Sequence, residues 1–237
     1  MAIAGLTDTG LLRPANQDYF QVEKKGSTIL AVVCDGIGGN RAGDVASATA
    51  CRSLAKSFET TFDISVDLQQ WLIKAVNKAN SAVYRKSAAS EKYAGMGTTL
   101  VGFIAGKNGT YVVNVGDSRC YGVIDDKLVQ ITEDHTLVND LIKHRGFPAE
   151  VANALVGKNV ISKAVGVAEK TDCDVFEVSG YDALLLCSDG LHGYVSEDAI
   201  MAVMREKSTP ASKCRKLIRL ANEAGGFDNI TAVIYQR

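Results

Sequence analysis

The chain has 237 residues, of which 46% are hydrophobic, 22% are charged and only 3 are proline. This composition is that of a globular protein with enough apolar area for a core, and it excludes a disordered chain. Lys and Arg total 26 against 27 for Asp and Glu, so the net charge of −1 provides no long-range field for nucleic acid or an anionic membrane surface.

Membrane spans, leaders and disulfides are not expected. The longest apolar runs, such as residues 29–34, are far shorter than the ~20 residues of a membrane helix, and the start of the chain lacks a basic leader region. None of the six cysteines forms a Cys-x-x-Cys pair, and Cys34 and Cys187 each end an apolar run. We therefore predict reduced, mostly buried thiols in a cytoplasmic protein.

The first predicted elements are a β-hairpin and two helices. Residues 18–35 form two strands joined by a turn at residues 25–27, and the second strand is expected to end at Asp35, where glycines follow. Apolar residues at helical spacing predict helices over residues 44–58 and 68–86. A helix pair over a sheet is the simplest arrangement for these elements.

Strands return in the middle of the chain. They are predicted at residues 98–105 and 111–115 and as a hairpin over residues 119–132. Short helices are predicted at residues 135–144 and 150–156. The glycines and proline between and after these two helices indicate an excursion over the surface.

The last third of the chain again mixes strands and helices. The predicted elements are strands at 174–178 and 183–187, a helix capped by Ser196, a helix that Thr209-Pro210 opens, and a strand at 230–235. Hairpins flanked by helix pairs, without regular βαβ alternation, favour an α+β fold over a doubly wound parallel sheet.

Three segments place an aspartate at the edge of an apolar strand: AVVCDGIGG with Asp35, LLLCSDGL with Asp189 and GGFDNITAVI with Asp228. Carboxylates at strand ends can meet in one cleft, and such hard oxygen ligands suit Mg²⁺ or Mn²⁺ rather than zinc. Each segment alone is more simply explained as a turn, because Asp-Gly and Asp-Asn favour turns. The repetition of the pattern makes a metal cleft the sharper hypothesis.

Two further residues extend this candidate site. Asp117, in NVGDSR, is a fourth aspartate at a strand end, and the alternative explanation is a turn with a local Asp-Arg pair. Arg13 precedes Pro14, which favours an extended backbone at the arginine. An arginine held in this way can present its planar fork to a phosphate.

Seven segments together resemble the ordered motifs of the metal-dependent (PPM, type 2C) protein serine/threonine phosphatases, in their compact bacterial form. They are RPANQD, CDGIGG, GMGTTLV, NVGDSR, ITEDH, CSDGL and DNITAVI, and they span residues 13–234. The resemblance implies one catalytic domain over residues 1–237. It also implies an α+β four-layer αββα sandwich of two mainly antiparallel sheets flanked by helix pairs, with a flap subdomain at about residues 143–159.

The same resemblance implies the metal ligands. Asp35 matches the carboxylate that bridges two Mn²⁺ or Mg²⁺ ions, and Gly36 matches the residue whose backbone carbonyl binds the first. Asp189 and Asp228 match the ligands of the second ion. Asp117 resembles the residue that, with Asp189, holds a third metal in bacterial members.

The implied reaction is hydrolysis of phosphoserine or phosphothreonine in proteins by a water that two metals activate. Arg13 matches the phosphate-binding arginine, and Asp18 matches the acid that orients the attacking water. Eukaryotic relatives have a histidine, proposed as the general acid, where this chain has Ile37, so that role is vacant. The chain's own three histidines are expected to be solvated rather than catalytic.

Other functions fit less well. A cysteine-dependent phosphatase needs Cys-x5-Arg, yet six residues separate Cys34 from Arg41, and Ser118 lies in no GxSxG elbow. The remaining alternative is a pseudophosphatase that binds phosphoproteins without hydrolysing them. For the phosphatase, the expected partners are phosphoprotein substrates and a cognate serine/threonine kinase, with no nucleic acid or membrane, and the expected state is a monomer.

Overall fold

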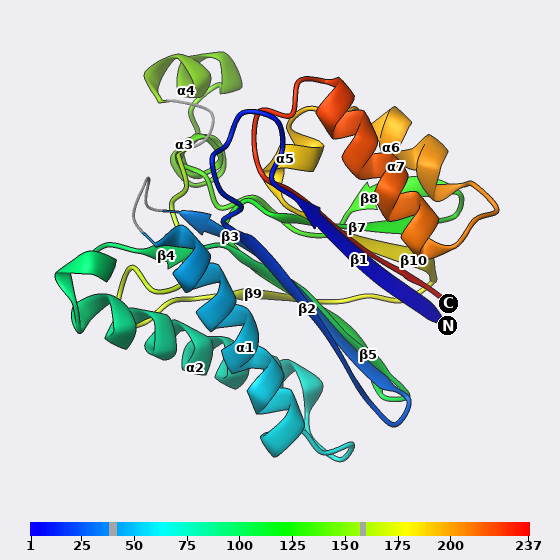
Figure 1. Ribbon diagram of the computed structural model, residues 1–237, viewed down its shortest axis with the longest axis horizontal. Helices are drawn as coiled ribbons and strands as arrows, with labels where there is room; N and C mark the ends of the chain where they lie inside the picture. The colour runs from blue at the N-terminus through cyan, green and yellow to red at the C-terminus, as the bar shows by residue number, and fades with distance from the viewer. Residues whose placement is uncertain (38–41, 157–159) are drawn as a thin grey trace.

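The computed structural model describes residues 1–37, 42–156 and 160–237. Two antiparallel sheets pack face to face, and helices cover the outer face of each (Figure 1). The expected α+β fold with four layers in the order αββα is therefore confirmed.

The first sheet has the strand order β2 (Asp18–Lys25), β3 (Thr28–Ile37), β5 (Leu100–Gly106), β6 (Gly109–Val115) and β9 (Asp174–Glu177), and β4 (Gly97–Thr98) pairs with the end of β3. Helices α1 (Gly43–Thr61) and α2 (Leu68–Ala88) cover its outer face, and the short η1 (Glu91–Tyr93) follows α2. This half of the molecule lies at the lower left of Figure 1.

The second sheet has the strand order β1 (Ala2–Asp8), β11 (Ile230–Gln236), β10 (Tyr181–Cys187), β7 (Arg119–Ile124) and β8 (Lys127–Gln130). Its outer face is covered by α6 (Glu197–Met204) and α7 (Pro210–Glu223), and the single turn α5 (Asp189–His192) follows β10. Ser196 and Thr209 cap the two longer helices, because their side chains accept from the N–H groups of Ala199 and Ser212.

The alternation along β3 shows why the sandwich forms. Leu30, Val32 and Cys34 pack against the helices of the first sheet, whereas Ala31 and Val33 pack against the second sheet. Because both faces of the strand are buried, its sequence is a continuous apolar run rather than an alternating one. The strand therefore contributes to two of the three apolar layers.

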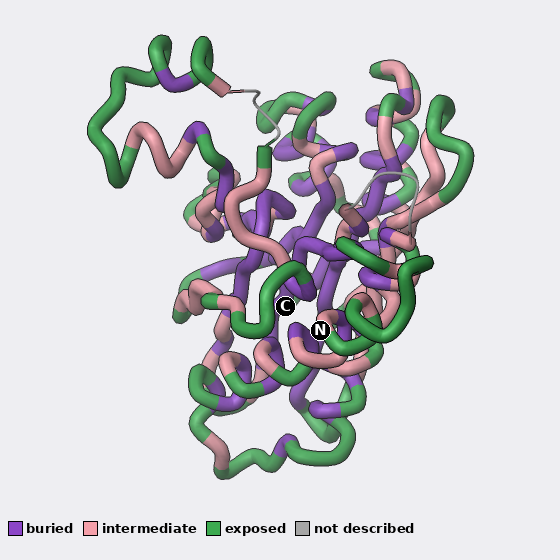
Figure 2. The backbone as a smooth tube through the Cα atoms, turned by 90° about the vertical axis from the view of Figure 1, so that its left-hand side faces the viewer, coloured by how far each residue is buried: buried purple, intermediate pink, exposed green. Residues whose placement is uncertain are grey.

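Between β8 and β9 the chain leaves the two sheets and forms α3 (Leu137–Arg145) and α4 (Ala149–Leu155). Figure 2 shows this excursion projecting from the body, with most of its residues exposed. It covers most of the predicted flap at residues 143–159, of which residues 157–159 lie outside the described part of the chain.

Three details differ from the sequence predictions. β3 does not end at Asp35 but continues to Ile37, because β4 pairs Thr98 with Gly36 and Gly97 with Ile37. β1 was not predicted, since its sequence AIAGLTD has few β-branched residues. The four-residue α5 is too short to show helical periodicity, so Asp189 begins a helix where a turn was expected.

All six cysteines are free and five of them are buried, as predicted. Within residues 1–37, 42–156 and 160–237, no helix has both the length and the apolar character needed to cross a bilayer.

Candidate active site

One cleft of about 250 Å³ contains six of the seven residues predicted for the site. Its lining consists of Arg13, Gln17, Asp35, Gly36, Ile37, Asp117, Ile161, Asp189, Asp228 and Asn229. These residues come from the loop after β1, the end of β3, the turn after β6, the segment between α4 and β9, the start of α5 and the segment before β11. The topology thus brings four carboxylates and one arginine together from sequence positions up to 215 residues apart.

Asp35 is fixed through its backbone at the end of β3. Its N–H donates to Oγ1 of Thr99 at 2.9 Å, and its carbonyl accepts from Oγ1 of Thr98 and the N–H of Thr99, both at 2.8 Å. The side chain is partly exposed to the cleft. Thr98 of β4 and the next residue, Thr99, therefore fix the backbone from which the carboxylate projects.

The glycines that follow two of these aspartates are required by close packing. A Cβ atom on Gly36 would lie 2.2 Å from the carbonyl oxygen of Gly43 at the start of α1. A Cβ atom on Gly190 would lie 2.0 Å from the carbonyl oxygen of Asn229. The Asp-Gly pairs are thus more than turn signals, because they let neighbouring backbone approach the carboxylates.

Asp18 is the one predicted site residue that does not line the cleft; it lies behind it, opposite Asp35 in the β2–β3 ladder. Its Oδ2 accepts from Oγ of Ser188 and Oγ1 of Thr231, both at 2.6 Å, whereas Oδ1 is buried without a partner. Burial is the main cause that raises the pKa of Asp18 to about 7, against the two hydroxyl donors. One carboxyl group therefore connects the first sheet to the second.

Asn229 organises the loop that carries Arg13, a role that was not predicted. Its Oδ1 accepts from the N–H of Gln17 at 2.8 Å, and its Nδ2 donates to the carbonyls of Thr9 at 2.8 Å and Ala15 at 3.0 Å. The only sequence signal was the Asn that follows Asp228. Its three partners lie more than 200 residues earlier in the chain, so the contact could not be deduced from local pattern.

Arg13 extends over the cleft and pairs with Asp228. Its Nη2 donates to Oδ2 of Asp228 at 2.7 Å, while the arginine side chain stays 49% exposed. This hydrogen bond is the main cause that raises the pKa of the guanidinium. The planar fork thus lies beside the carboxylates and still faces solvent, where a phosphate can reach it.

The ionised form of these carboxylates is disfavoured in the cleft. Burial first, and then the neighbouring charges of Asp18, Asp189, Asp117 and Asp228, raise the pKa of Asp35 well above its usual value. Burial, followed by the charge of Asp189, raises the pKa of Asp117 to about 7. Groups that repel one another in this way are stabilised by bound cations.

The donor set fits divalent cations that keep part of their water. Oδ1 of Asp189 is buried without a hydrogen-bond partner, which leaves it available as a ligand. Among the described residues, no group of three or more His, Cys, Asp or Glu side chains is arranged so that it could hold a metal ion by itself. Mg²⁺ and similar ions are commonly held by one or two carboxylates plus water, so an incomplete protein cage of hard oxygens is consistent with them.

The prediction that the three histidines are solvated was wrong for His135 and holds in full only for His144. His135 is only 5% exposed; its Nδ1 accepts from the N–H of Gly116 at 3.0 Å, and its Nε2 lies 3.0 Å from Oδ2 of Asp174. His192 is partly buried, and its Nε2 lies 3.1 Å from the carbonyl of Asp117. His144 is exposed, as expected. Both ring nitrogens of His135 are therefore engaged in holding the structure together.

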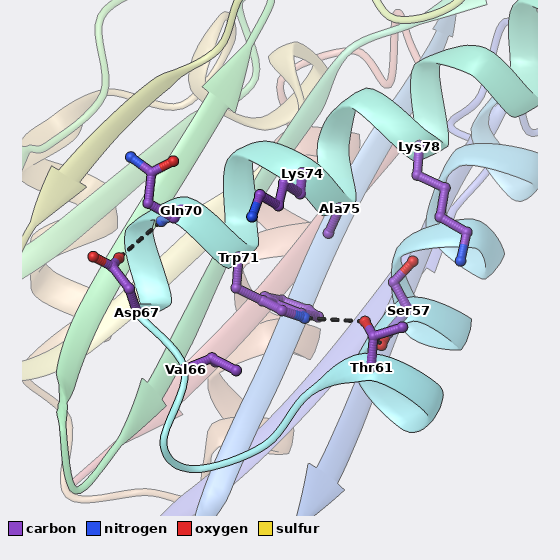
Figure 3. Close-up of a pocket in the computed structure, with 9 residues that line it drawn as sticks. All are labelled: Ser57, Thr61, Val66, Asp67, Gln70, Trp71, Lys74, Ala75 and Lys78. Carbon is purple, nitrogen blue, oxygen red and sulfur yellow. Dashed lines mark hydrogen bonds between the residues drawn. The ribbon is translucent and has the colours of Figure 1, made fainter.

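A larger cavity, of about 530 Å³, lies between α1 and α2. Figure 3 shows its lining, in which Nε1 of Trp71 donates to Oγ1 of Thr61 and Asp67 caps the start of α2. It contains one carboxylate and no arginine or histidine. We therefore assign the chemistry to the smaller cleft, where the ionisable groups converge.

Comparison with known proteins agrees with this geometry. The family model for protein phosphatase 2C matches residues 14–223. The chain belongs to the protein phosphatase 2C family. It is therefore a phosphoprotein phosphatase, and the family is metal-dependent.

The named relatives in this family are bacterial. The chain is 38% identical to the serine/threonine phosphatase Stp of Listeria monocytogenes, over 98% of this chain and 94% of that protein. It is 35% identical to the protein phosphatase PhpP of Streptococcus pneumoniae, over 99% of this chain and 96% of the relative. The crystal structure of the serine/threonine phosphatase Stp1 from Staphylococcus aureus matches with a TM-score of 0.89 and 32% identity, over 99% of this chain and 94% of that one.

Proposed function

We propose that the chain removes phosphate from phosphoserine and phosphothreonine in proteins, and that the cleft around Asp35 holds two Mn²⁺ or Mg²⁺ ions. Asp35 would bind both ions, the Gly36 carbonyl would bind the first, and Asp189 and Asp228 would bind the second. Asp117, together with Asp189, would hold a third ion. The observation that carries the proposal is the convergence of four carboxylates beside one exposed arginine in a family of phosphatases.

Other residues in and behind the cleft bind the phosphate and orient the attacking water. The divalent ions, when bound, supply positive charge and a water of lowered pKa. Arg13 binds the phosphate oxygens with its planar fork. Ser188 and Thr231 hold one oxygen of Asp18, so its free Oδ1 can accept a hydrogen bond from the attacking water and orient it.

The departing serine or threonine oxygen needs a proton, and this chain has Ile37 at the position of the histidine proposed as general acid in eukaryotic relatives. Ile37 and Ile161 line the cleft but cannot donate. The ring nitrogens of His135 are occupied by Gly116 and Asp174. We infer that water supplies this proton.

Metal removal and replacement test this proposal directly. Metal-stripped protein should not hydrolyse a phosphothreonine peptide, and added Mn²⁺ or Mg²⁺ should restore the reaction. Asp35→Asn and Asp228→Asn should each lower kcat/KM by at least about 100-fold, since losing even an outer partner of a metal ligand typically costs 10–100-fold. The same variants should lose the Mn²⁺-dependent rise in melting temperature, a readout independent of turnover.

Asp182→Asn is the matched control, because Asp182 is exposed on β10 outside the cleft. It should keep both the activity and the response to Mn²⁺. Full activity of the metal-stripped protein, or of Asp35→Asn, would refute the site assignment. Binding of phosphopeptide without hydrolysis at any metal concentration would support the pseudophosphatase alternative instead.

The location, oligomeric state and partner of the enzyme are also proposals. We infer a cytoplasmic enzyme, consistent with six free cysteines, that acts as a monomer and opposes a cognate serine/threonine kinase. Residues 1–237 form one catalytic domain, and the excursion that contains α3 and α4 acts as its flap. Ile161, which follows the excursion, lines the cleft, so the flap is connected to the site where substrate binds.

A further inference from the structure

Four large apolar side chains are exposed beside the cleft. Leu11 is 67% exposed, Leu12 65%, Phe227 47% and Tyr194 41%. We call these four residues the apolar rim. None of them belongs to the buried clusters that make up the core or to the partly buried side chains packed on those clusters. Their exposure is therefore not explained by the packing of the sandwich.

Two backbone segments align the rim with the phosphate-binding arginine. The N–H groups of Leu11 and Leu12 donate to the carbonyl of Gly226 at 2.8 and 3.2 Å. The next contact along the same two segments is the ion pair of Arg13 with Asp228 at 2.7 Å. Apolar side chains thus come immediately before both members of the pair. Figure 1 shows the loop after β1 beside the segment that precedes β11.

The two aromatic residues extend the rim towards a second cavity. The rings of Tyr194 and Phe227 are 5.2 Å apart between centroids, at 31° to one another. Tyr194 also lines a neighbouring cavity of about 380 Å³ together with Asp117 and Asp189. The rim is therefore continuous with the carboxylate cleft rather than a separate patch.

Exposed apolar side chains that gather next to polar groups commonly mark a contact with another molecule. The short distance between the rim and Arg13 indicates which part of the other molecule contacts the rim. An extended polypeptide advances about 3.3 Å per residue, so when a phosphorylated residue reaches Arg13, its neighbours in the chain lie within a few ångströms of that site. An apolar neighbour would cover the rim and remove apolar surface on both partners from water.

We propose that the apolar rim binds an aliphatic or aromatic side chain next to the phosphorylated residue of the substrate polypeptide. This inference rests on the proposed function and adds a substrate preference to it. The enzyme selects phosphoserine or phosphothreonine with apolar neighbours over the same phosphoresidue with polar ones. Arg13 recognises the phosphate, and the rim recognises its sequence context.

Three substrates test the rim. Two are phosphothreonine peptides that differ only in having Leu and Phe, or Ser, at the two positions on each side. The third is N-acetyl-phosphothreonine amide, which has no neighbouring residues. For the wild-type enzyme with Mn²⁺, kcat/KM should be about tenfold or more higher for the apolar peptide, the factor expected for partial burial of one large apolar side chain.

The variant Leu11→Ser/Phe227→Ser should reduce this ratio to about twofold or less, because a serine offers little apolar area. Its kcat/KM for the small amide should stay unchanged. Ile64→Ser is the matched control, since Ile64 is 51% exposed in the turn between α1 and α2, away from the cleft. If the double variant does not fold, Leu11→Ser alone should still lower the ratio.

The outcomes are distinguishable. Equal rates of the wild-type enzyme on the two peptides would overturn the rim proposal, and so would an equal loss on the amide and on both peptides in the variant. A wild-type dimer that becomes monomeric in the variant, with the peptide preference unchanged, would assign the rim to self-association and overturn it as well. If none of the three substrates is hydrolysed at any Mn²⁺ or Mg²⁺ concentration, the proposed function itself fails.

Discussion

Arg13 is held by an interaction that a substrate can replace. Its bond to Asp228 joins two side chains that are 49% and 23% exposed, and such surface pairs contribute only about 0–1 kcal/mol to stability. A phosphate carrying nearly two negative charges competes well for the same guanidinium. The loop that carries Arg13 is in turn fixed by Asn229. The arginine is therefore positioned by its backbone, and its side chain can still change partner.

We predict that Arg13→Ala raises KM for a phosphothreonine peptide by about tenfold, equivalent to about 1.4 kcal/mol, with a smaller change in kcat. Arg13→Lys should recover only part of the loss, because an ammonium group cannot bind two phosphate oxygens with a planar fork. Steady-state kinetics with saturating Mn²⁺ would measure both variants. An unchanged KM for Arg13→Ala would remove the arginine from the phosphate site.

At the scale of residues, the sequence predicted which side chains meet but not what holds them. Asp35, Asp189 and Asp228 could be proposed because each borders an apolar strand. The hydrogen bonds that orient them could not, since Thr99 and Asn229 reach partners far away in the chain. Such contacts depend on the tertiary packing of several elements, which no local pattern encodes.

Among the elements, the turn after β6 depends on a side chain from the segment before α3. His135 accepts the N–H of Gly116 through Nδ1, so its Nε2 carries the proton and donates to Asp174 at the start of β9. The N–H of His135 also donates to the carbonyl of Gly116 at 2.9 Å. One residue thus fixes the turn that presents Asp117 and the base of the excursion.

We expect His135→Ala to lower the free energy of unfolding by about 1–3 kcal/mol, because the buried N–H of Gly116 loses its acceptor. Urea denaturation measures this change, and hydrogen exchange should become faster at residues 116–118. His144→Ala is the matched control. His144 is exposed on α3, so its removal should change stability by no more than about 0.5 kcal/mol. Equal stabilities of the two variants would contradict this role for His135.

The elements that were predicted are those with a strong local period. α1 and α2 are long amphipathic helices, and β3 is a run of apolar residues that ends at charged and glycine residues. β1 was not predicted because its strand conformation depends on pairing with β11, at the opposite end of the chain. A strand that forms through its pairing with a distant strand leaves no periodic pattern in its own residues.

For the whole molecule, hairpins and helix pairs were enough to predict α+β layers, but the strand order was not predictable from the residues. The loop after β1, the end of β3 and the segment before β11 meet at one end of the sandwich only because β1 and β11 are neighbours and β2 faces the other sheet. The resemblance to a family supplied that arrangement. The cleft is therefore a product of topology, and its carboxylates are brought together at an electrostatic cost.

That cost should be visible in the stability of the metal-free protein. Burial raises the pKa of Asp18 and of Asp117 from 3.8 to about 7 in the folded state. Below pH 3.8 both groups are protonated in the folded and the unfolded chain, so they do not change the free energy of unfolding with pH. Between pH 3.8 and about 7 the folded chain binds more protons, so the contribution of these groups to stability falls as pH rises and is constant above that range.

We therefore predict that metal-free wild-type protein loses stability over this pH range relative to Asp18→Asn and Asp117→Asn, which cannot ionise at these positions. Differences in the free energy of unfolding from urea titrations at a series of pH values measure the effect and cancel the other titrating groups. Saturating Mn²⁺ should reduce the slope of the wild-type protein, because cations offset the repulsion that keeps these carboxyls protonated. A wild-type stability that rises through this window relative to both variants would show that the carboxyls ionise freely in the fold, and the electrostatic reason for placing metals in the cleft would be lost.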